Sequence, residues 1–222
     1  GELSSLTTTN LLATFESWHF MSQRIRAICL SSIRVGQSID ALRVSAKAVG
    51  CSTPTFISHQ LVSGVSCVAC RRMESIDDYS EAVCVMLPRL HVASIQCSHV
   101  LVVQWDGFVL NPNAWSSEFL DYDYIGAPWV NDRGCATVGN GGFSIRSKRL
   151  HSAMIHLGGW NRDHEDAQIC IHRRRELEEL GVRFAPFGVA ARFSVENPPW
   201  RNRPAYAGQF GFHSMKTIGR SW

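Results

Sequence analysis

The chain has 222 residues, of which 45% are hydrophobic and 18% are charged. This balance is typical of a globular protein and excludes a largely disordered chain. The formal net charge of +3 is too small to indicate binding to nucleic acid or to a membrane surface. No uncharged apolar run approaches the ~20 residues that a membrane span needs, so we expect no transmembrane segment.

The eight cysteines favour a reduced, intracellular chain, and we expect a cytoplasmic location. Most of them lie in apolar or helical stretches, where a free cysteine behaves as a small hydrophobic residue. The sequence has no Asn-x-Ser/Thr glycosylation site and no visible signal peptide, although the start at Gly1 leaves a removed leader open. Cys67 and Cys70 have a zinc-like spacing, but without a second pair we favour strand cysteines.

The first half of the chain predicts strands alternating with helices, the start of a βαβ layout in an α/β fold. We expect strands at residues 24–33, 55–57 and 65–69, a helix over residues 39–49, and a helix from residue 77 to 90. Gly50 should end the first helix, and Pro88 should kink or split the second. Residues 1–23 form an N-terminal segment of uncertain structure, with a helix over residues 10–22 as one option. We expect residues 24–222 to form a single domain.

The central strand is predicted at residues 100–103, and a single carboxylate, Asp106, follows it. The run is short, apolar and β-branched, as in strands buried on both faces of a parallel sheet. Ligands of open α/β sheets bind beyond the carboxyl ends of such strands. A charge buried there is costly unless it is paired or holds a metal. We therefore interpret Asp106 as a metal ligand, although an Asp that caps the turn explains its position equally well.

The second half predicts shorter elements around a glycine-rich loop. We expect a turn at residues 111–113, a tight loop at 126–129, strands at 143–146, 182–184 and 190–195, and helices at 148–157 and 165–180. Arg174–Glu178 and Arg175–Glu179 are spaced as i,i+4 ion pairs, so the triple arginine is read as a solvated face rather than a phosphate site.

Three further motifs carry chemistry only in combination. The loop Gly139–Gly142 could leave space for a sugar or phosphate, but taken alone it is better explained as a hairpin turn. Glu165 and Asp166 could supply a general base, but acidic residues at a helix start are also ordinary capping charges. His213 alone is more often a packed or surface histidine. Taken singly, each ordinary explanation is favoured.

Together these motifs resemble known families. The strings are Trp105-Asp106-Gly107, DYDYIGAPW at 121–129, GNGGFS at 139–144, Glu165-Asp166 and VAARFSVE at 189–196. Over about residues 24–213 they look like a family of uncharacterised, glycosyltransferase-like domains catalogued as a domain of unknown function. Their order also resembles the common core of GT-A glycosyltransferases: an Asp-x-Asp metal motif, a glycine loop, an x-Glu-Asp motif and a late histidine. The resemblance implies a GT-A-like fold with a mixed, mostly parallel central sheet flanked by helices.

The resemblance further implies transfer of a sugar from a nucleotide-sugar, a UDP-sugar first, to a hydroxyl of a glycan or other acceptor, with inversion. Asp106 and His213 would hold a divalent metal, Mn²⁺ or Mg²⁺. One departure matters, because Gln104 stands where the first Asp of Asp-x-Asp belongs. Metal affinity and donor contacts are therefore expected to differ from those of the family.

The remaining expected roles follow from the same resemblance. Asp166 would deprotonate the acceptor, while Glu165 would orient the acceptor or replace Asp166 as the base. Gly141 and Gly142 would leave room for the sugar. The expected donor contacts are Ser31, Tyr79, Gln104, Trp105 and Asp106. Trp105 and Trp129 could stack on sugar or base, but core packing is favoured for both. Residues 131–138 and 197–209 are expected to shape the acceptor side.

Two other functions stay open from the sequence. The Gln104 departure is compatible with a nucleotide- or glycan-binding module that kept the fold and lost turnover. A metal-dependent phosphoryl or nucleotidyl transferase ranks third, because two metals would need more clustered carboxylates than the motifs supply.

Overall fold

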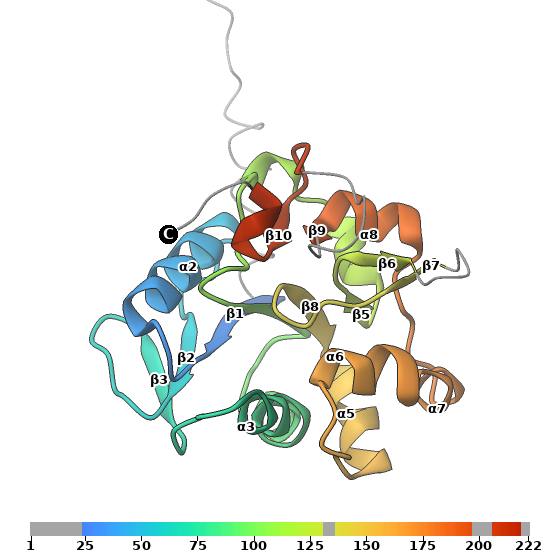
Figure 1. The fold of residues 1–222 in the computed structure, drawn as a ribbon, viewed down its shortest axis with the longest axis horizontal. Coiled ribbons are helices and arrows are strands. Elements are labelled where there is room, and N and C mark those ends of the chain that lie inside the picture. The colour runs from blue at the N-terminus through green and yellow to red at the C-terminus, as the bar shows by residue number, and fades with distance from the viewer. Residues whose placement is uncertain (1–23, 131–135, 197–205, 219–222) are drawn as a thin grey trace, which may run out of the picture.

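The computed structural model describes residues 24–130, 136–196 and 206–218. Its central feature is a six-stranded sheet in the order β3-β2-β1-β4-β8-β5 (Figure 1). The strands are β1 (Ile25–Leu30), β2 (Thr55–Ser58), β3 (Ser66–Ala69), β4 (His99–Val103), β5 (Tyr124–Ile125) and β8 (Ser144–Ser147). Strands β1 to β4 pair in parallel, and β8 runs antiparallel to both of its neighbours. This confirms an α/β fold with a mixed, mostly parallel sheet.

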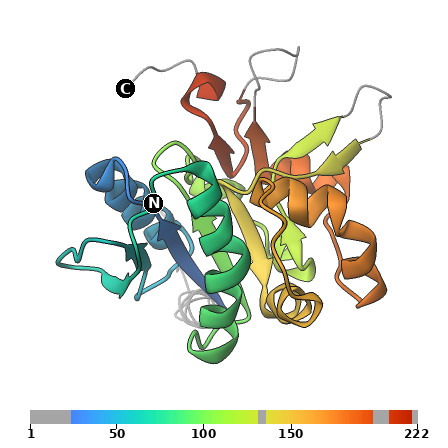
Figure 2. The ribbon, with the colours of Figure 1, turned by 60° about the horizontal axis from the view of Figure 1, so that its bottom comes forward.

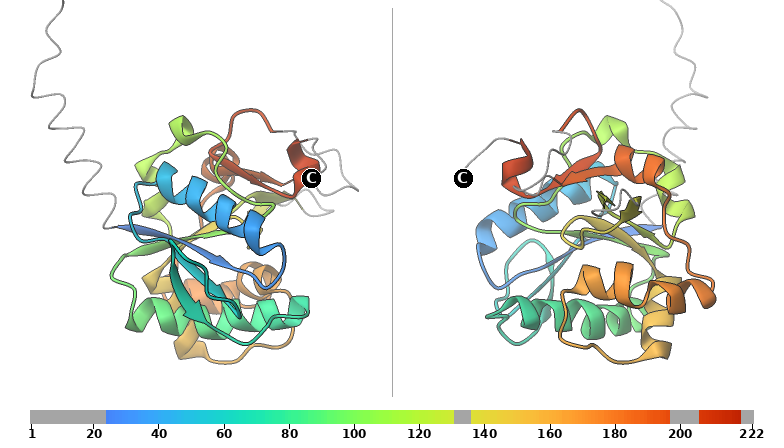
Figure 3. Two further views of the ribbon diagram at one scale, coloured as in Figure 1. Left: turned by 90° about the vertical axis from the view of Figure 1, so that its left-hand side faces the viewer. Right: turned by 45° about the vertical axis from the view of Figure 1, so that its right-hand side comes forward.

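Helices cover both faces of the sheet. Helix α2 (Val35–Ala48) lies on one face, and the rod formed by α3 (Ile76–Glu81), η1 (Ala82–Met86) and α4 (Leu87–Ala93) lies on the other (Figures 2 and 3). Helix α5 (Lys148–Leu157) packs beside α4. The flanking helices complete the predicted layers.

Strand β4 is buried on both faces, as its apolar run predicts. Leu101 and Val103 join the core beneath α2, whereas Val100 and Val102 join the core beneath the rod of α3 and α4. Alternate side chains of a strand point to opposite faces, so an uninterrupted apolar run serves two cores at once. Each fully buried side chain of this kind contributes about 1.5–3 kcal/mol. The strand therefore anchors whatever follows it, including Asp106.

The remaining elements are short and follow β4 in the chain. They are β6 (Pro128–Val130), β7 (Ala136–Val138), α6 (Glu165–Ala167), η4 (Gln168–His172), α7 (Arg174–Glu179), α8 (Phe187–Phe193), β9 (Ser194–Glu196), β10 (Gly211–His213), and the short helices η2 (Pro112–Ala114), η3 (Ser117–Asp121) and η5 (Met215–Ile218). Strands β9 and β10 pair in parallel, and an isolated bridge joins Gly211 to Val109, which follows β4. The C-terminal residues are thereby returned to the end of the central strand.

Several local predictions are wrong. The strand expected at residues 190–195 is helix α8 up to Phe193, and only Ser194–Glu196 is extended. Pro186 stands at the helix N-cap, and Val189, Ala190 and Phe193 share its buried side. A short apolar run does not distinguish helix from strand, and here the helical spacing decides. The tight loop expected at 126–129 includes the start of β6, and the strand expected at 182–184 is reduced to a bridge at Phe184.

Two of the expected helices are interrupted by π-helical turns. The helix expected at residues 77–90 contains η1 immediately before Pro88, whose missing N–H disturbs the regular hydrogen-bond ladder. The helix nevertheless continues through Pro88 as one rod, so the predicted split is wrong and the irregularity is confined to the π-helical turn. The helix expected at 165–180 is divided into α6, η4 and α7. Its Arg174–Glu178 and Arg175–Glu179 pairs form as predicted, at 2.9 and 3.0 Å.

Other expectations concern single residues and uncertain segments. Gly50 follows α2 with a φ of 65°, as a residue that ends a helix does. The described cysteines are free. No helix in the described ranges is long and apolar enough to cross a membrane. The helix expected at residues 10–22 lies outside the described residues, as does much of the two stretches expected to shape the acceptor side.

Candidate functional site

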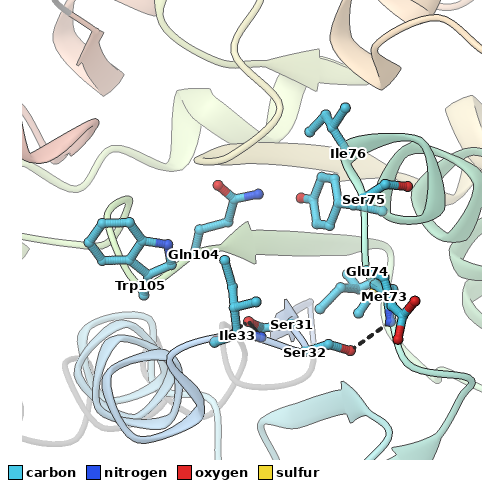
Figure 4. Close-up of a pocket in the computed structure, with 11 residues that line it drawn as sticks. Ser31, Ser32, Ile33, Met73, Glu74, Ser75, Ile76, Gln104 and Trp105 are labelled. Carbon is cyan, nitrogen blue, oxygen red and sulfur yellow. Dashed lines mark hydrogen bonds between the residues drawn. The ribbon is translucent and has the colours of Figure 1, made fainter.

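A cavity of about 340 Å³ lies at the carboxyl ends of β1 and β4 (Figure 4). The chain runs outward from β1 through β2 to β3 and then returns to place β4 on the other side of β1. The cavity therefore occupies the point where the strand order reverses, which is where open α/β sheets bind ligands. Its walls include four residues predicted as donor contacts, Ser31, Tyr79, Gln104 and Trp105.

Short hydrogen bonds hold the floor of this cavity. The Ser31 hydroxyl donates to the carbonyl of Ile33 over 2.6 Å, which tightens the turn after β1. The Ser32 hydroxyl accepts from the backbone N–H of Met73 over 2.9 Å and so ties that turn to the segment before α3 (Figure 4). The floor is thus braced by backbone contacts from two separate segments.

Arg34, which contacts Trp105 of the cavity wall, is a residue that sequence reasoning missed. It has a φ of 46°, a left-handed conformation that is unfavourable for a side chain other than glycine. Its guanidinium lies 4.2 Å from the centre of the Trp105 ring. The cation–π contact covers one face of Trp105, and the ring packs against a small apolar cluster, in line with the packing role favoured from the sequence. A positive φ outside glycine and asparagine leaves no signal in the sequence.

The Tyr79 hydroxyl is a buried polar group that points toward this site. Its oxygen is buried near Gln104 and lacks a well-formed hydrogen bond to any described residue. Burial raises the pKa of Tyr79, so the hydroxyl stays protonated. The Tyr79 hydroxyl and the neighbouring Gln104 amide are thus the polar groups that a ligand in the cavity could contact.

Asp106 and His213 meet beside the cavity, as their predicted shared role requires. Asp106 Oδ1 lies 3.7 Å from His213 Nε2, and each side chain is about 20% exposed. Asp106 Oδ1 is itself buried without a hydrogen-bond partner among the described residues. Donors bound at about 2.0–2.1 Å to one ion can lie up to about 4 Å apart, so the pair fits a divalent metal.

The donor set for such an ion is small. No group of three or more His, Cys, Asp or Glu side chains suited to a metal occurs within the described ranges. Gln104 Oε1, which replaces the first Asp of the motif, lies 3.1 Å from His213 Nε2. The site therefore offers one carboxylate, one imidazole and one neighbouring amide, and an ion bound here would need further oxygen ligands from a substrate or water.

His213 is held by two further residues on its other side. Its Nδ1 lies 3.1 Å from Glu196 Oε1, and the indole N–H of Trp129 donates to Glu196 Oε2 over 2.8 Å. Burial acts to lower the pKa of His213, but the hydrogen bond and charge of Glu196, with the charges of Asp106 and Asp166, raise it above its ordinary value. Trp129 is thus engaged at its polar end and packs against the core, in line with the packing role favoured from the sequence.

The glycines near Asp106 make room for the protein's own side chains. A Cβ at Gly141 would lie 1.4 Å from Glu165 Oε1, and one at Gly142 would lie 2.3 Å from His213 Nε2. A Cβ at Gly107 would lie 2.9 Å from His213 Cδ2. The expectation that Gly141 and Gly142 leave space for the sugar is therefore wrong. They allow Glu165 and His213 to approach the loop.

Glu165 is paired with a buried arginine on β8. Arg146 Nη2 lies 2.9 Å from Glu165 Oε2, and the same nitrogen donates to the carbonyl of Gly141 over 3.2 Å. Burial raises the pKa of Glu165 to about 7, while the charge and hydrogen bond of Arg146 act in the opposite direction. Since its carboxylate faces Arg146 and the loop, Glu165 supports the site, and its expected role toward the acceptor stays a prediction.

Asp166 remains available for chemistry. It is half-buried, and its Oδ2 accepts from the N–H of Gly141 over 3.4 Å while Oδ1 accepts from the N–H of Ala167 over 2.8 Å. The π-helical turn η4 begins two residues later. Arg146 and Glu196, which organise this site, were missed because each acts through a partner distant in sequence.

Comparison with known proteins identifies the family of the chain. No curated protein is similar enough to the chain to count as a match. Residues 64–213 match a family described as "Protein of unknown function (DUF5672)". The matched range runs from just before β3 to His213 and includes Asp106, the glycine loop and Asp166. Because the match spans more than half of the sequence, the chain belongs to the DUF5672 family of proteins of unknown function.

Proposed function

We propose that the chain is a metal-dependent glycosyltransferase of the GT-A type, which moves a sugar from a nucleotide-sugar to an acceptor hydroxyl. One observation carries the proposal. The cavity at the strand-order reversal is linked to the Asp106–His213 pair through Gln104, which lines the cavity and whose Oε1 lies 3.1 Å from His213 Nε2. A nucleotide in the cavity would then present its diphosphate to that pair.

The donor is proposed to be a UDP-sugar. A cavity of about 340 Å³ lies at the lower end of the range of small-molecule pockets, about 300–1,000 Å³. The unpartnered hydroxyl of Tyr79 and the amide of Gln104 offer polar contacts there. Trp105 would contact the donor with the part of its ring that Arg34 leaves open.

Asp106 and His213 are the proposed metal ligands, with Gln104 beside them. A bound Mn²⁺ or Mg²⁺ would neutralise the charge that develops on the leaving diphosphate. Asp106 contributes a carboxylate oxygen that has no other hydrogen-bond partner among the described residues. His213 contributes a ring nitrogen whose orientation depends on its neighbours.

Asp166 is the proposed general base. The acceptor hydroxyl would lose its proton to an Asp166 carboxylate oxygen as its own oxygen attacks the anomeric carbon. The N–H of Gly141 and the Arg146–Glu165 pair hold Asp166 at the glycine loop. A base placed behind the anomeric carbon leads to inversion of configuration.

A binding module without turnover is the second candidate. It is favoured by Gln104, which removes one carboxylate from the metal motif, and by the engagement of Glu165 with Arg146. A phosphoryl or nucleotidyl transferase with two metals is disfavoured by the small donor set in the described part of the chain.

Asp166→Asn tests the enzymatic role against the binding role. The measurement is release of UDP from a panel of UDP-sugars, with Mn²⁺ and with or without candidate acceptors. We expect the wild type to release UDP and Asp166→Asn to lose at least about 100-fold in rate, because a positioned base contributes about 10²–10⁴-fold. Nucleotide affinity should not change.

The matched control is Asp163→Asn, in the same segment, whose side chain is 38% exposed and pairs with His172. It should keep the wild-type rate. UDP binding without release of UDP by the wild type, with any donor or acceptor, would instead support the binding module. Equal rates for Asp166→Asn and the wild type would remove Asp166 from the mechanism.

A further inference from the structure

We infer that Glu196, held by the indole N–H of Trp129, is a positioning residue that fixes the ring of His213 so that Nε2 faces Asp106 and a bound divalent metal. The inference rests on the proposed function, because it concerns the metal of that site. It adds two residues to which nothing in the motif assigns a role.

The two nitrogens of the His213 ring face different partners. Nε2 lies 3.7 Å from Asp106 Oδ1 and 3.1 Å from Gln104 Oε1. Nδ1 lies 3.1 Å from Glu196 Oε1 on the opposite side of the ring. A ring turned about its Cβ–Cγ bond would aim Nδ1 away from Glu196 and withdraw Nε2 from Asp106. The contact with Glu196 therefore selects the orientation that the metal needs.

The position of Glu196 follows from strand register. Strands β9 and β10 pair in parallel, and His213 stands directly opposite Glu196. Directly opposed residues on paired strands have neighbouring side chains. With the Nδ1–H donated to this carboxylate, a neutral ring would carry its lone pair on Nε2, the nitrogen that would bind a metal.

Trp129 holds the other oxygen of the same carboxylate. Its Nε1–H donates to Glu196 Oε2 over 2.8 Å. The indole ring packs against Gly139, where a Cβ would lie 2.3 Å from ring carbons. Trp129 therefore links the start of the glycine loop to Glu196, and Glu196 links it to His213. Strands β6, β9 and β10 each contribute one residue to this chain of contacts.

The arrangement has a known physical consequence. Histidines that bind metals usually donate their second N–H to a carboxylate or carbonyl, which fixes the tautomer and strengthens the ligand. Loss of such a partner typically weakens metal affinity by about 10–100-fold. Glu196 is suited to this role, because its carboxylate is anchored at both oxygens.

The test is the affinity for Mn²⁺ in the presence of saturating UDP, measured from the loss of the free Mn²⁺ electron paramagnetic resonance signal. We expect Glu196→Ala to bind Mn²⁺ about 10–100-fold more weakly than the wild type. Trp129→Phe keeps an aromatic ring but removes the N–H donor, so it should weaken binding by a smaller factor. Glu196→Gln retains an acceptor oxygen and should fall between Glu196→Ala and the wild type.

The control is Glu178→Ala, which removes a carboxylate from an exposed ion pair on α7 and should bind Mn²⁺ as the wild type does. Melting curves show which variants fold. If Glu196→Ala does not fold, the comparison rests on Trp129→Phe and Glu196→Gln. Wild-type affinity in folded Glu196 and Trp129 variants would overturn this inference and leave the metal site intact. Absence of Mn²⁺ binding by the wild type would overturn the proposed metal site, and this inference with it.

Discussion

At the scale of single residues, the glycines around Asp106 serve the assembly of the site rather than the access of a ligand. Gly141 and Gly142 lie so close to Glu165 and His213 that a Cβ at either position would collide with them. Glycine allows such approach because it has no side chain. The loop can therefore bring a buried ion pair and the candidate metal ligand to one place.

This close approach predicts that Gly141→Ala destabilises the protein strongly. The added methyl would overlap the Glu165 carboxylate, which Arg146 holds in place, so we expect a loss of at least about 1–3 kcal/mol in the free energy of unfolding. The control is Gly188→Ala in α8, where nothing lies within 4 Å of a Cβ, and it should be neutral or slightly stabilising. Urea denaturation measures both, and equal stabilities would contradict the placement of Glu165.

Sequence reasoning could predict the residues of the site better than their partners. Asp106 and His213 are named by the order of motifs, and the structure brings them within 3.7 Å. Arg146 and Glu196 could not be named, because their roles depend on burial and on the pairing of β9 with β10. Isolated residues of these types are ordinarily solvated, so only the fold distinguishes them.

At the scale of elements, the spacing of apolar residues predicts a helix or strand whose burial pattern is regular along its whole length. The helix expected at 148–157 is α5 with the same bounds, because its apolar residues recur on one side. Strand β4 follows from its uninterrupted apolar run. The error at α8 and the π-helical turns have a different origin, since short apolar runs are ambiguous and π turns arise from local packing.

Helices α4 and α5 are joined by two buried histidines. His91 Nε2 lies 3.1 Å from the carbonyl of Cys97 and must donate to it, so His91 Nδ1 accepts from His151 Nδ1 over 2.8 Å. This arrangement requires His91 to be neutral, and the burial of His151 Nε2 without a partner disfavours a proton there as well. Burial lowers the pKa of His91 to about 4 and lowers that of His151 as well.

The histidine pair predicts a loss of stability in mild acid. Below about pH 6.5 these histidines bind protons in the unfolded chain but stay neutral in the folded one. The free energy of unfolding therefore falls as the pH is lowered toward about 4. Each pH unit in this window costs up to about 1.4 kcal/mol per histidine. His151→Leu should flatten the dependence of the unfolding free energy on pH. The exposed His156→Leu on the same helix should keep the wild-type slope, and identical slopes in the two variants would contradict the neutral pair.

At the scale of the whole molecule, the order of the strands determines where function resides. The reversal between β1 and β4 creates the cavity, the buried β4 carries Asp106 to its edge, and β10 returns His213 to the same edge. Residues more than a hundred positions apart in the sequence thus form one candidate site. We propose that Asp106 and His213 in this site bind a divalent metal together with a nucleotide diphosphate.

Calorimetric titration of UDP into the wild type and into Asp106→Ala, with and without Mn²⁺, measures whether the metal strengthens nucleotide binding through Asp106. We predict binding by the wild type that strengthens at least about tenfold with Mn²⁺, and no effect of Mn²⁺ in Asp106→Ala. Asp40→Ala, at an exposed position on α2, should match the wild type. Binding of UDP that Mn²⁺ does not affect, or the same Mn²⁺ dependence in Asp106→Ala, would contradict the proposed metal site.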